Sequence, residues 1–142
     1  FDNGMLVLVN YTYTSGDMSL PADADAASDD GGRDVPYFKQ AEGTGNVVIG
    51  YDKDQWDVRL ALNYRDSYLD ELGDTALQDR YTDAYTNADL TAKYKVSDNL
   101  TIRGAVLNLL DSPEYYYFGN AARLSQYDEY GVSYEIGFRY KL

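Results

Sequence analysis

The sequence contains neither cysteine nor histidine among its 142 residues. Disulfide bonds, thiolate metal sites and histidine acid–base catalysis are therefore excluded. No run of apolar residues is long enough to form a membrane-spanning helix. Basic residues are also scarce, with 12 Lys and Arg against 24 Asp and Glu, and the resulting formal charge of −12 argues against nucleic acid as a partner.

Tyrosine, by contrast, is abundant at 16 residues, and apolar and polar side chains alternate strictly in several stretches. In the clearest stretch, 132–142, every second residue from Val132 to Leu142 is large and apolar or aromatic. A period of two is typical of a β-strand with two different faces, and this length is about what a tilted strand needs to cross a bilayer. The predicted strands are 5–14, 43–51, 55–65, 84–96, 100–107 and 132–142.

The connections between these strands are alternately long and short. Tight turns are expected at 52–54 and 97–99, where turn-forming residues cluster. The segments 15–39, 66–83 and 108–127 lack periodicity and are predicted to be long loops, the first of them acidic and mobile. Antiparallel strands place the short turns at one edge of the sheet and the long loops at the other, so the predicted fold is an all-β antiparallel meander.

Two features favour a transmembrane sheet over a soluble one. Aromatic residues stand near the ends of apolar faces whose centres are aliphatic, as in the girdles of membrane barrels. The apolar faces carry no charge, and a charge at the bilayer midplane costs about 2–4 kcal/mol, so the register is strongly specified. The predicted aromatic girdle is Trp56, Tyr64, Tyr94, Tyr134 and Tyr140, and the predicted basic wall of the lumen is Arg59, Arg65, Lys93, Lys95, Arg103, Arg139 and Lys141.

Six strands are too few to close a membrane barrel, because bacterial barrels begin at eight and an open sheet edge cannot stand in lipid. We therefore expect the chain to be a piece of a larger barrel or to close with strands from elsewhere. In such barrels the short turns are periplasmic and the long loops extracellular, which would place the C-terminus in the periplasm.

Three further groups of residues are candidate sites. The acidic segment 15–39 contains Asp23 and Asp25 but no EF-hand pattern, so a solvated loop is favoured over calcium binding. The basic wall is expected to pair with acidic groups in the lumen, with attraction of an anionic substrate as the alternative. No nucleophile or base lies on a rigid element, so we expect neither an enzyme nor a cofactor. An aromatic cluster in the third long loop is either a ligand contact or local packing; it consists of Tyr115, Tyr116, Tyr117 and Phe118.

Several short motifs resemble the C-terminal end of TonB-dependent outer-membrane receptors. Asn108-Leu109-Leu110-Asp111 is similar to an Asn-Leu-Phe-Asp element after the penultimate strand, with Leu110 in place of Phe. The final strand resembles the family's Gly-aromatic-x-aromatic ending through Gly137, Phe138 and Tyr140, with Leu142 where Phe is usual. The resemblance to this family extends to the segments 10–13 and 62–65, and to the segment 51–53 together with Trp56.

The resemblance implies that residues 1–142 are the C-terminal portion of a 22-stranded barrel, without its plug and N-terminal strands. It implies a place in the Gram-negative outer membrane and active import of a scarce, bulky nutrient such as a ferric siderophore, cobalamin or an oligosaccharide. The TonB complex would supply energy through the absent plug, with which the basic wall would pair. A passive porin or structural barrel is the alternative, and a soluble ligand-binding β-barrel is a third.

The final strand also resembles the signal read by the barrel assembly machinery. The residues that fit this pattern are Glu135, Gly137, Tyr140 and Leu142. An unfolded strand of this kind can be captured by addition to an exposed sheet edge, with alternate side chains giving specificity. Simple exposure to lipid explains the same residues, and the two roles are compatible.

Overall fold

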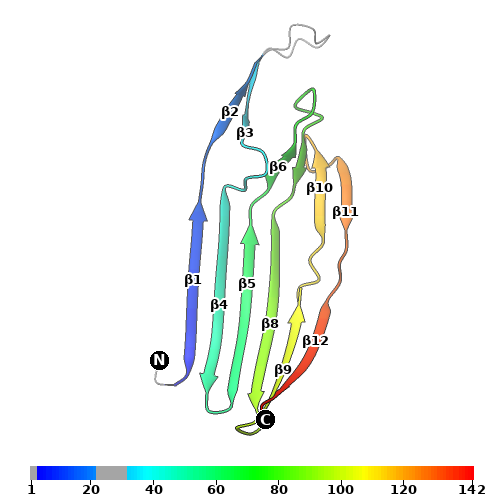
Figure 1. The fold of residues 1–142 in the computed structure, drawn as a ribbon. Helices are drawn as coiled ribbons and strands as arrows, with labels where there is room; N and C mark the ends of the chain where they lie inside the picture. The colour runs from blue at the N-terminus through cyan, green and yellow to red at the C-terminus, as the bar shows by residue number, and fades with distance from the viewer. Residues whose placement is uncertain (1–2, 22–31) are drawn as a thin grey trace.

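The computed structural model describes residues 3–21 and 32–142, and its main body is one six-stranded antiparallel sheet (Figure 1). The strand order is β1-β4-β5-β8-β9-β12, so each strand pairs with its sequence neighbour in this sheet. The predicted meander is therefore confirmed. The strands are β1 (Met5–Tyr13), β4 (Gly43–Lys53), β5 (Trp56–Arg65), β8 (Tyr85–Lys95), β9 (Leu100–Leu107) and β12 (Ser133–Tyr140).

The described parts of the segments predicted as long loops contain short strands, and here the prediction is wrong. The first contains β2 (Asp17–Leu20) and β3 (Arg33–Pro36), which pair as a hairpin. The other two contain β6 (Tyr68–Glu71), β7 (Arg80–Thr82), β10 (Glu114–Phe118) and β11 (Leu124–Asp128), which form a second sheet in the order β11-β10-β7-β6. Strands of three to five residues are too short to show a period, so the sequence pattern missed them.

The register of the six-stranded sheet brings all the predicted apolar faces onto one surface, which we call the apolar face. Leu60 of β5 lies opposite Ile49 and Leu90, and Leu90 lies opposite Val106. Many side chains of this face are exposed, and Ile136 and Phe138 expose 89% and 81% of their area. An exposed apolar surface of this extent is stable only against another apolar phase or a partner.

The opposite surface, the polar face, is held together by side-chain hydrogen bonds. Asn46, Asn63 and Asn87 occupy one row on β4, β5 and β8. The Asn46 Nδ2 group donates to Asn63 Oδ1 at 2.8 Å, and Asn63 Nδ2 donates to Asn87 Oδ1 at 2.9 Å. Cross-strand pairs of this kind stabilise a sheet and help to set its register.

All short connections lie at one end of the main sheet and all three long hairpins at the other, as Figure 1 shows. The β4–β5 turn is Asp54-Gln55 rather than the predicted 52–54, because Lys53 still pairs with Trp56. The Ser97–Asn99 turn is confirmed, and Ser97 Oγ accepts hydrogen bonds from the backbone of Asn99 and Leu100. In the described part of the chain the sheet is not closed, and β1 and β12 form its edges.

The described residues include no helix with the length and apolar character needed to cross a membrane.

Candidate functional site

Most of the predicted basic wall lies at the short-turn end of the sheet, where two of its cations pair with Asp57 on the polar face. Arg59 Nε and Lys93 Nζ approach the two oxygens of Asp57 at 2.9 Å and 3.0 Å. Lys95 instead pairs with the exposed Asp98 of the following turn at 2.9 Å. One carboxylate therefore serves two cations here, and such partly exposed pairs contribute little net stability.

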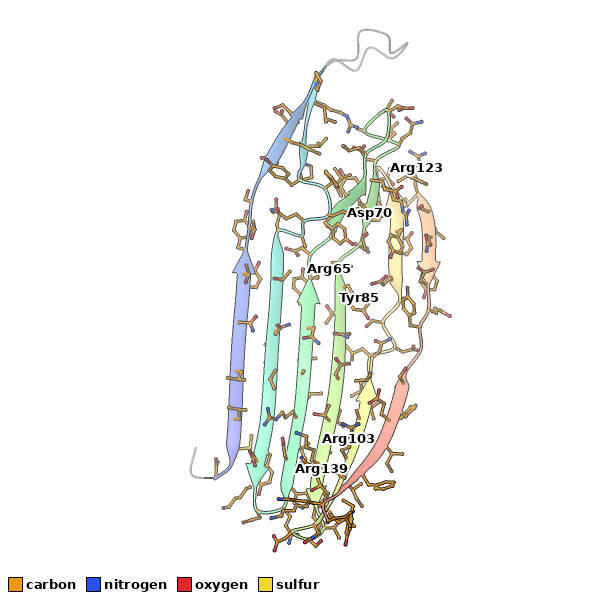
Figure 2. The ribbon with its side chains drawn as sticks, in the orientation of Figure 1. Arg65, Asp70, Tyr85, Arg103, Arg123 and Arg139 are labelled. Carbon is orange, nitrogen blue, oxygen red and sulfur yellow. The ribbon has the colours of Figure 1, made fainter. Side chains whose placement is uncertain are left out.

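Arg103 and Arg139 extend this wall onto β9 and β12 and lie near the lower end of the sheet in Figure 2. Lys93 lies directly opposite Arg103, and Arg103 lies opposite Gly137. Arg139 is one row away, opposite Thr101. A hollow of about 480 Å³ lies among these residues, and a second of about 310 Å³ lies beside Gly137.

Arg65 is separated from the rest of the predicted basic wall. It ends β5 at the hairpin end of the sheet, as Figure 2 shows. Its guanidinium carbon lies 4.9 Å from the ring centre of Tyr68 and 5.8 Å from that of Tyr85. Stacking of a guanidinium on aromatic rings stabilises the cation and fixes its orientation. Lys141 follows β12, and its backbone N–H donates to the carbonyl of Asn99 at 2.8 Å.

The predicted aromatic girdle is brought together only in part. Trp56 and Tyr94 lie opposite each other at the short-turn end, with ring centres 4.5 Å apart. Tyr64 lies at the other end of β5, where its hydroxyl donates to Asp66. Tyr134 shares a row with Leu90 through Val106, between these two ends. Tyr140 lies opposite Leu100 near the short turns.

The predicted aromatic cluster forms the centre of the small sheet made by the long hairpins. Tyr117 stacks on Tyr81 of β7 at 5.5 Å between ring centres, with the planes 12° apart. The ring centre of Tyr115 lies 6.3 Å from that of Tyr117 and 6.4 Å from that of Tyr127. Phe118 is partly exposed and pairs with Arg80 in the ladder. Local packing of the cluster is therefore observed, and ligand contact stays a prediction.

Tyr116 points to the other side of β10 and forms a polar group with its neighbours. The guanidinium carbon of Arg80 lies 4.7 Å from its ring centre. Its hydroxyl donates to Glu114 Oε2 at 2.8 Å. This hydrogen bond, together with burial and the charge of Glu114, raises the pKa of Tyr116 to about 12. Arg80 also reaches Gln126 on β11, so the group joins three strands.

A buried ion pair between Arg33 and Asp79 joins the first hairpin to the second, and the sequence analysis missed it. The two terminal guanidinium nitrogens of Arg33, Nη1 and Nη2, donate to the carboxylate, and Nη2 also donates to the Gly73 carbonyl at 3.1 Å. Asp79 is only 1% exposed and also accepts from the Gly73 backbone N–H at 2.9 Å. Burial alone would raise the pKa of Asp79, but these hydrogen bonds and the charge of Arg33 outweigh it and lower the pKa.

Asn108, noted in the sequence only for its motif, is a structural link between elements. Its backbone N–H donates to Asp89 Oδ1 of β8 at 2.9 Å, and its side-chain amide donates to the carbonyl of Gly131 at 3.1 Å. Its Oδ1 accepts from the Ser112 N–H at 3.0 Å. Its φ of 53° lies in the left-handed region, which asparagine tolerates better than most residues. The first residue of the Asn108–Asp111 motif therefore holds the β9–β10 connection against β8 and against the segment before β12.

The residues of the predicted assembly signal lie on β12 and just beyond it. Gly137 is in the polar face, and Tyr140 is on the apolar face. Glu135 and Leu142 are exposed. The possible calcium ligands Asp23 and Asp25 lie outside the described residues. Within residues 3–21 and 32–142, no group of three or more acidic side chains is placed to hold a metal ion.

Comparison with known proteins gives a family and one relative. Residues 3–109 match the family model described as TonB dependent receptor-like, beta-barrel. The chain is also similar to a protein from Photobacterium profundum named vitamin B12 transporter BtuB, with 30% identity over 82 residues. That match covers 58% of this chain but 13% of the relative. No solved structure matches the chain.

Proposed function

Because the chain belongs to the TonB-dependent receptor-like β-barrel family, whose proteins are outer-membrane receptors and transporters rather than enzymes, we propose that it forms six neighbouring strands of an active nutrient transporter. In this proposal the apolar face meets lipid and the polar face lines the lumen. The observation that carries the proposal is the apolar face shared by all six strands, in which the one charged residue of the paired rows is Lys53, opposite Trp56 at the short-turn end.

The long hairpins are proposed to be extracellular and the short turns periplasmic, as in other outer-membrane barrels. The ion pair of Arg33 with Asp79 and the stacked tyrosines support ordered hairpins rather than free loops. An ordered surface at the mouth of a barrel suits the capture of a bulky solute, because less entropy is lost on binding. The exposed ring of Phe118 is the first residue to test for ligand contact.

Energy-dependent uptake by the intact protein tests this function. Cells that express it are expected to take up one of three labelled nutrients: a ferric siderophore, cobalamin or an oligosaccharide. Cobalamin is the first to try because of the relative's name. Uptake should disappear when the TonB complex is removed or when the proton gradient is collapsed. Uptake that persists under both treatments contradicts active transport.

A passive porin is the alternative. It would conduct ions through a permanently open lumen, so the purified intact protein in a planar bilayer distinguishes the two. We expect no steady conductance from the transporter, whereas large, stable conductance steps would favour the porin. Monodisperse behaviour of the intact protein in buffer without detergent would contradict both membrane functions.

A further inference from the structure

A basic residue lies on the apolar face of the main sheet, at the end with the short turns (Figure 1). Strand β4 extends to Lys53, and alternation places this lysine on the same face as Tyr51. Lys53 begins a row whose other members are aromatic or aliphatic, namely Trp56, Tyr94, Ile102 and Phe138. A cation therefore stands at the end of a row that otherwise suits lipid.

Lys53 and Trp56 carry hydrogen-bond donors that have no acceptor in the described part of the chain. Lys53 is exposed, and within residues 3–21 and 32–142 it forms no ion pair. Trp56 is 49% exposed, and its indole N–H meets no acceptor among the same residues. Side chains opposite each other in an antiparallel pair have Cβ atoms about 4.5–5.5 Å apart, so two free donors lie side by side on this face.

Three carboxylates lie close to Lys53 in the sequence, and two of them belong to the other face of the sheet. Asp52 lies opposite Asp57 in a row of the polar face, and Asp57 already holds two cations there. Asp54 follows Lys53 in the turn, where it is exposed and forms no ion pair with any described residue. The free charged groups are thus a cation on the last row of the apolar face and an anion in the turn just beyond it.

The surroundings of the two donors are ordered. Gly4, with a φ of 82°, accepts a backbone N–H of β4 at its carbonyl at 2.7 Å. A Cβ atom at Gly4 would lie 2.7 Å from Lys53 Cβ, so this glycine packs directly on the base of the lysine side chain. The ring centres of Trp56 and Tyr94 are 4.5 Å apart, and the Tyr94 hydroxyl donates to Gln55 Oε1 at 2.9 Å. Such a base limits the entropy that is lost when the donors bind a ligand.

We propose that Lys53, Trp56 and Asp54 bind the zwitterionic headgroup of a phospholipid, phosphatidylethanolamine, whose acyl chains lie along the apolar face. The phosphate accepts from the Lys53 ammonium and the Trp56 indole N–H, and the headgroup ammonium pairs with the Asp54 carboxylate. Tryptophan side chains at a membrane interface lie at the level of the headgroups, where a cation costs far less than at the midplane. A lysine that only extends toward water needs neither a free indole N–H nor an unpaired carboxylate beside it. The inference rests on the part of the proposed function that places the apolar face in lipid.

Carbodiimide coupling in outer membranes that contain the intact protein tests the headgroup contact. The reagent joins a carboxylate to an amine in contact with it, so it is expected to attach phosphatidylethanolamine to Asp54. Mass spectrometry would find this adduct on the peptide that contains the β4–β5 turn. Lys53→Gln is expected to lower the yield several-fold, because the phosphate loses its cation. Lys95→Gln is the matched control, since it removes a cation at the same end of the sheet that pairs with Asp98 instead.

Lipid retention by the purified intact protein tests the same site without covalent chemistry. Native mass spectrometry compares phosphatidylethanolamine with phosphatidylglycerol of the same acyl chains, and the parent is expected to retain the first lipid several-fold better. Asp54→Asn should abolish that preference, because only the ethanolamine headgroup carries an ammonium. Lys53→Gln and Trp56→Phe should weaken retention of both lipids. Trp56→Phe keeps an aromatic ring and removes the N–H, so its effect reports the hydrogen bond to the phosphate.

The proposal is wrong if Asp98, in the other short turn, takes up the lipid as readily as Asp54, or if the yield at Asp54 does not depend on Lys53. Equal retention of the two lipids, or a preference for phosphatidylglycerol, also overturns it. Energy-dependent uptake is measured in the same cells, so the two proposals fail separately. Intact uptake without the adduct overturns only the lipid site, whereas a Lys53-dependent adduct without uptake supports the site and contradicts the transport function.

Discussion

The six-stranded sheet and the small sheet of the long hairpins differ in how far their apolar side chains are buried. In the main sheet Ile136 and Phe138 are more than four-fifths exposed, and in the small sheet Leu69 is completely buried. The tyrosines of the hairpins contact one another, and a buried ion pair joins two of the hairpins. The apolar face of the main sheet therefore needs an apolar phase or a partner to cover it, whereas the hairpins supply part of their own core. Alternation indicates two faces but does not say what each face meets.

Loss of the buried carboxylate in the hairpins is expected to have the largest effect. Asp79→Ala removes the partner of Arg33 and should destabilise the hairpin region by about 3 kcal/mol, because breaking a buried ion pair leaves a poorly solvated charge. Hydrogen exchange in β3, β6 and β7 of the intact protein would measure the loss of protection. Asp74→Ala, at an exposed acid in the same turn, is the control. Equal effects of the two substitutions would refute a special role of Asp79.

The lowered pKa of Asp79 gives this contact a defined pH range. A carboxyl group whose folded-state pKa lies below its ordinary value of about 3.9 stabilises the fold above that value. The stabilisation is lost as the pH falls through the folded-state pKa. Protection of the hairpin amides should therefore be unchanged between pH 7 and 5, after correction for intrinsic exchange, and should fall only below about pH 4.

A charge on the apolar face of the main sheet is expected to have the next largest effect. Leu60→Arg introduces a cation in the row of Leu90 and Val106, at a cost of about 2–4 kcal/mol if that row lies near the bilayer midplane. Ala61→Arg puts the same cation on the polar face, opposite Asp89, and is expected to be tolerated. Heat-modifiable gel mobility and urea titration of the membrane-embedded protein compare the two. Equal tolerance would mean that the apolar face does not meet lipid.

Removal of the link between the two regions is expected to have an intermediate effect. Asn108→Ala deletes the side-chain hydrogen bonds to Gly131 and Ser112 and should cost about 1–3 kcal/mol, because partly buried backbone groups lose their partners. Leu110→Ala, in the same motif but at a side chain that is 53% exposed, should cost less. Urea midpoints of the intact protein measure both. A larger effect at Leu110 would show that the motif acts through its apolar residue.

The smallest expected effect concerns Tyr116 on the polar side of β10. Its raised pKa means that the protonated form is favoured in the folded state, so its hydrogen bond to Glu114 stabilises the hairpin up to about pH 10 and is lost as the pH passes about 12. Tyr116→Phe should cost about 0.5–1.5 kcal/mol. The difference in ultraviolet titration between this variant and the parent should show a midpoint near 12, provided the fold survives at that pH.

Glu114→Gln tests the cause of that shift. Without the charged acceptor, the Tyr116 midpoint should move toward the ordinary value of about 10. An unchanged midpoint would assign the shift to burial instead.

The sequence alone was sufficient for the main sheet because its strands are eight to eleven residues long. Over that length a period of two is unmistakable. It identifies each strand and also which of its residues lie on the apolar face and which on the polar face. The hairpin strands contain three to five residues, and their order depends on contacts between segments far apart in the chain. The prediction of loops failed there for that reason.

The candidate sites divide in the same way. The face on which each cation of the basic wall lies followed from alternation, including Arg103 and Arg139. Their proximity to Lys93 did not, because it depends on the register of three strands. Arg65 shares their face but lies at the other end of the sheet against Tyr68 and Tyr85. No local signal pairs Arg33 with Asp79, which are 46 residues apart.

Sequence by itself therefore determined the two faces of the main sheet, the charges on them and the alternation of long and short connections. Each of these depends on local periodicity and turn chemistry. Tertiary structure decided which cations share a patch, which tyrosines stack and which acid is buried. These features depend on cross-strand neighbours, and a strand acquires its neighbours only when the sheet has formed.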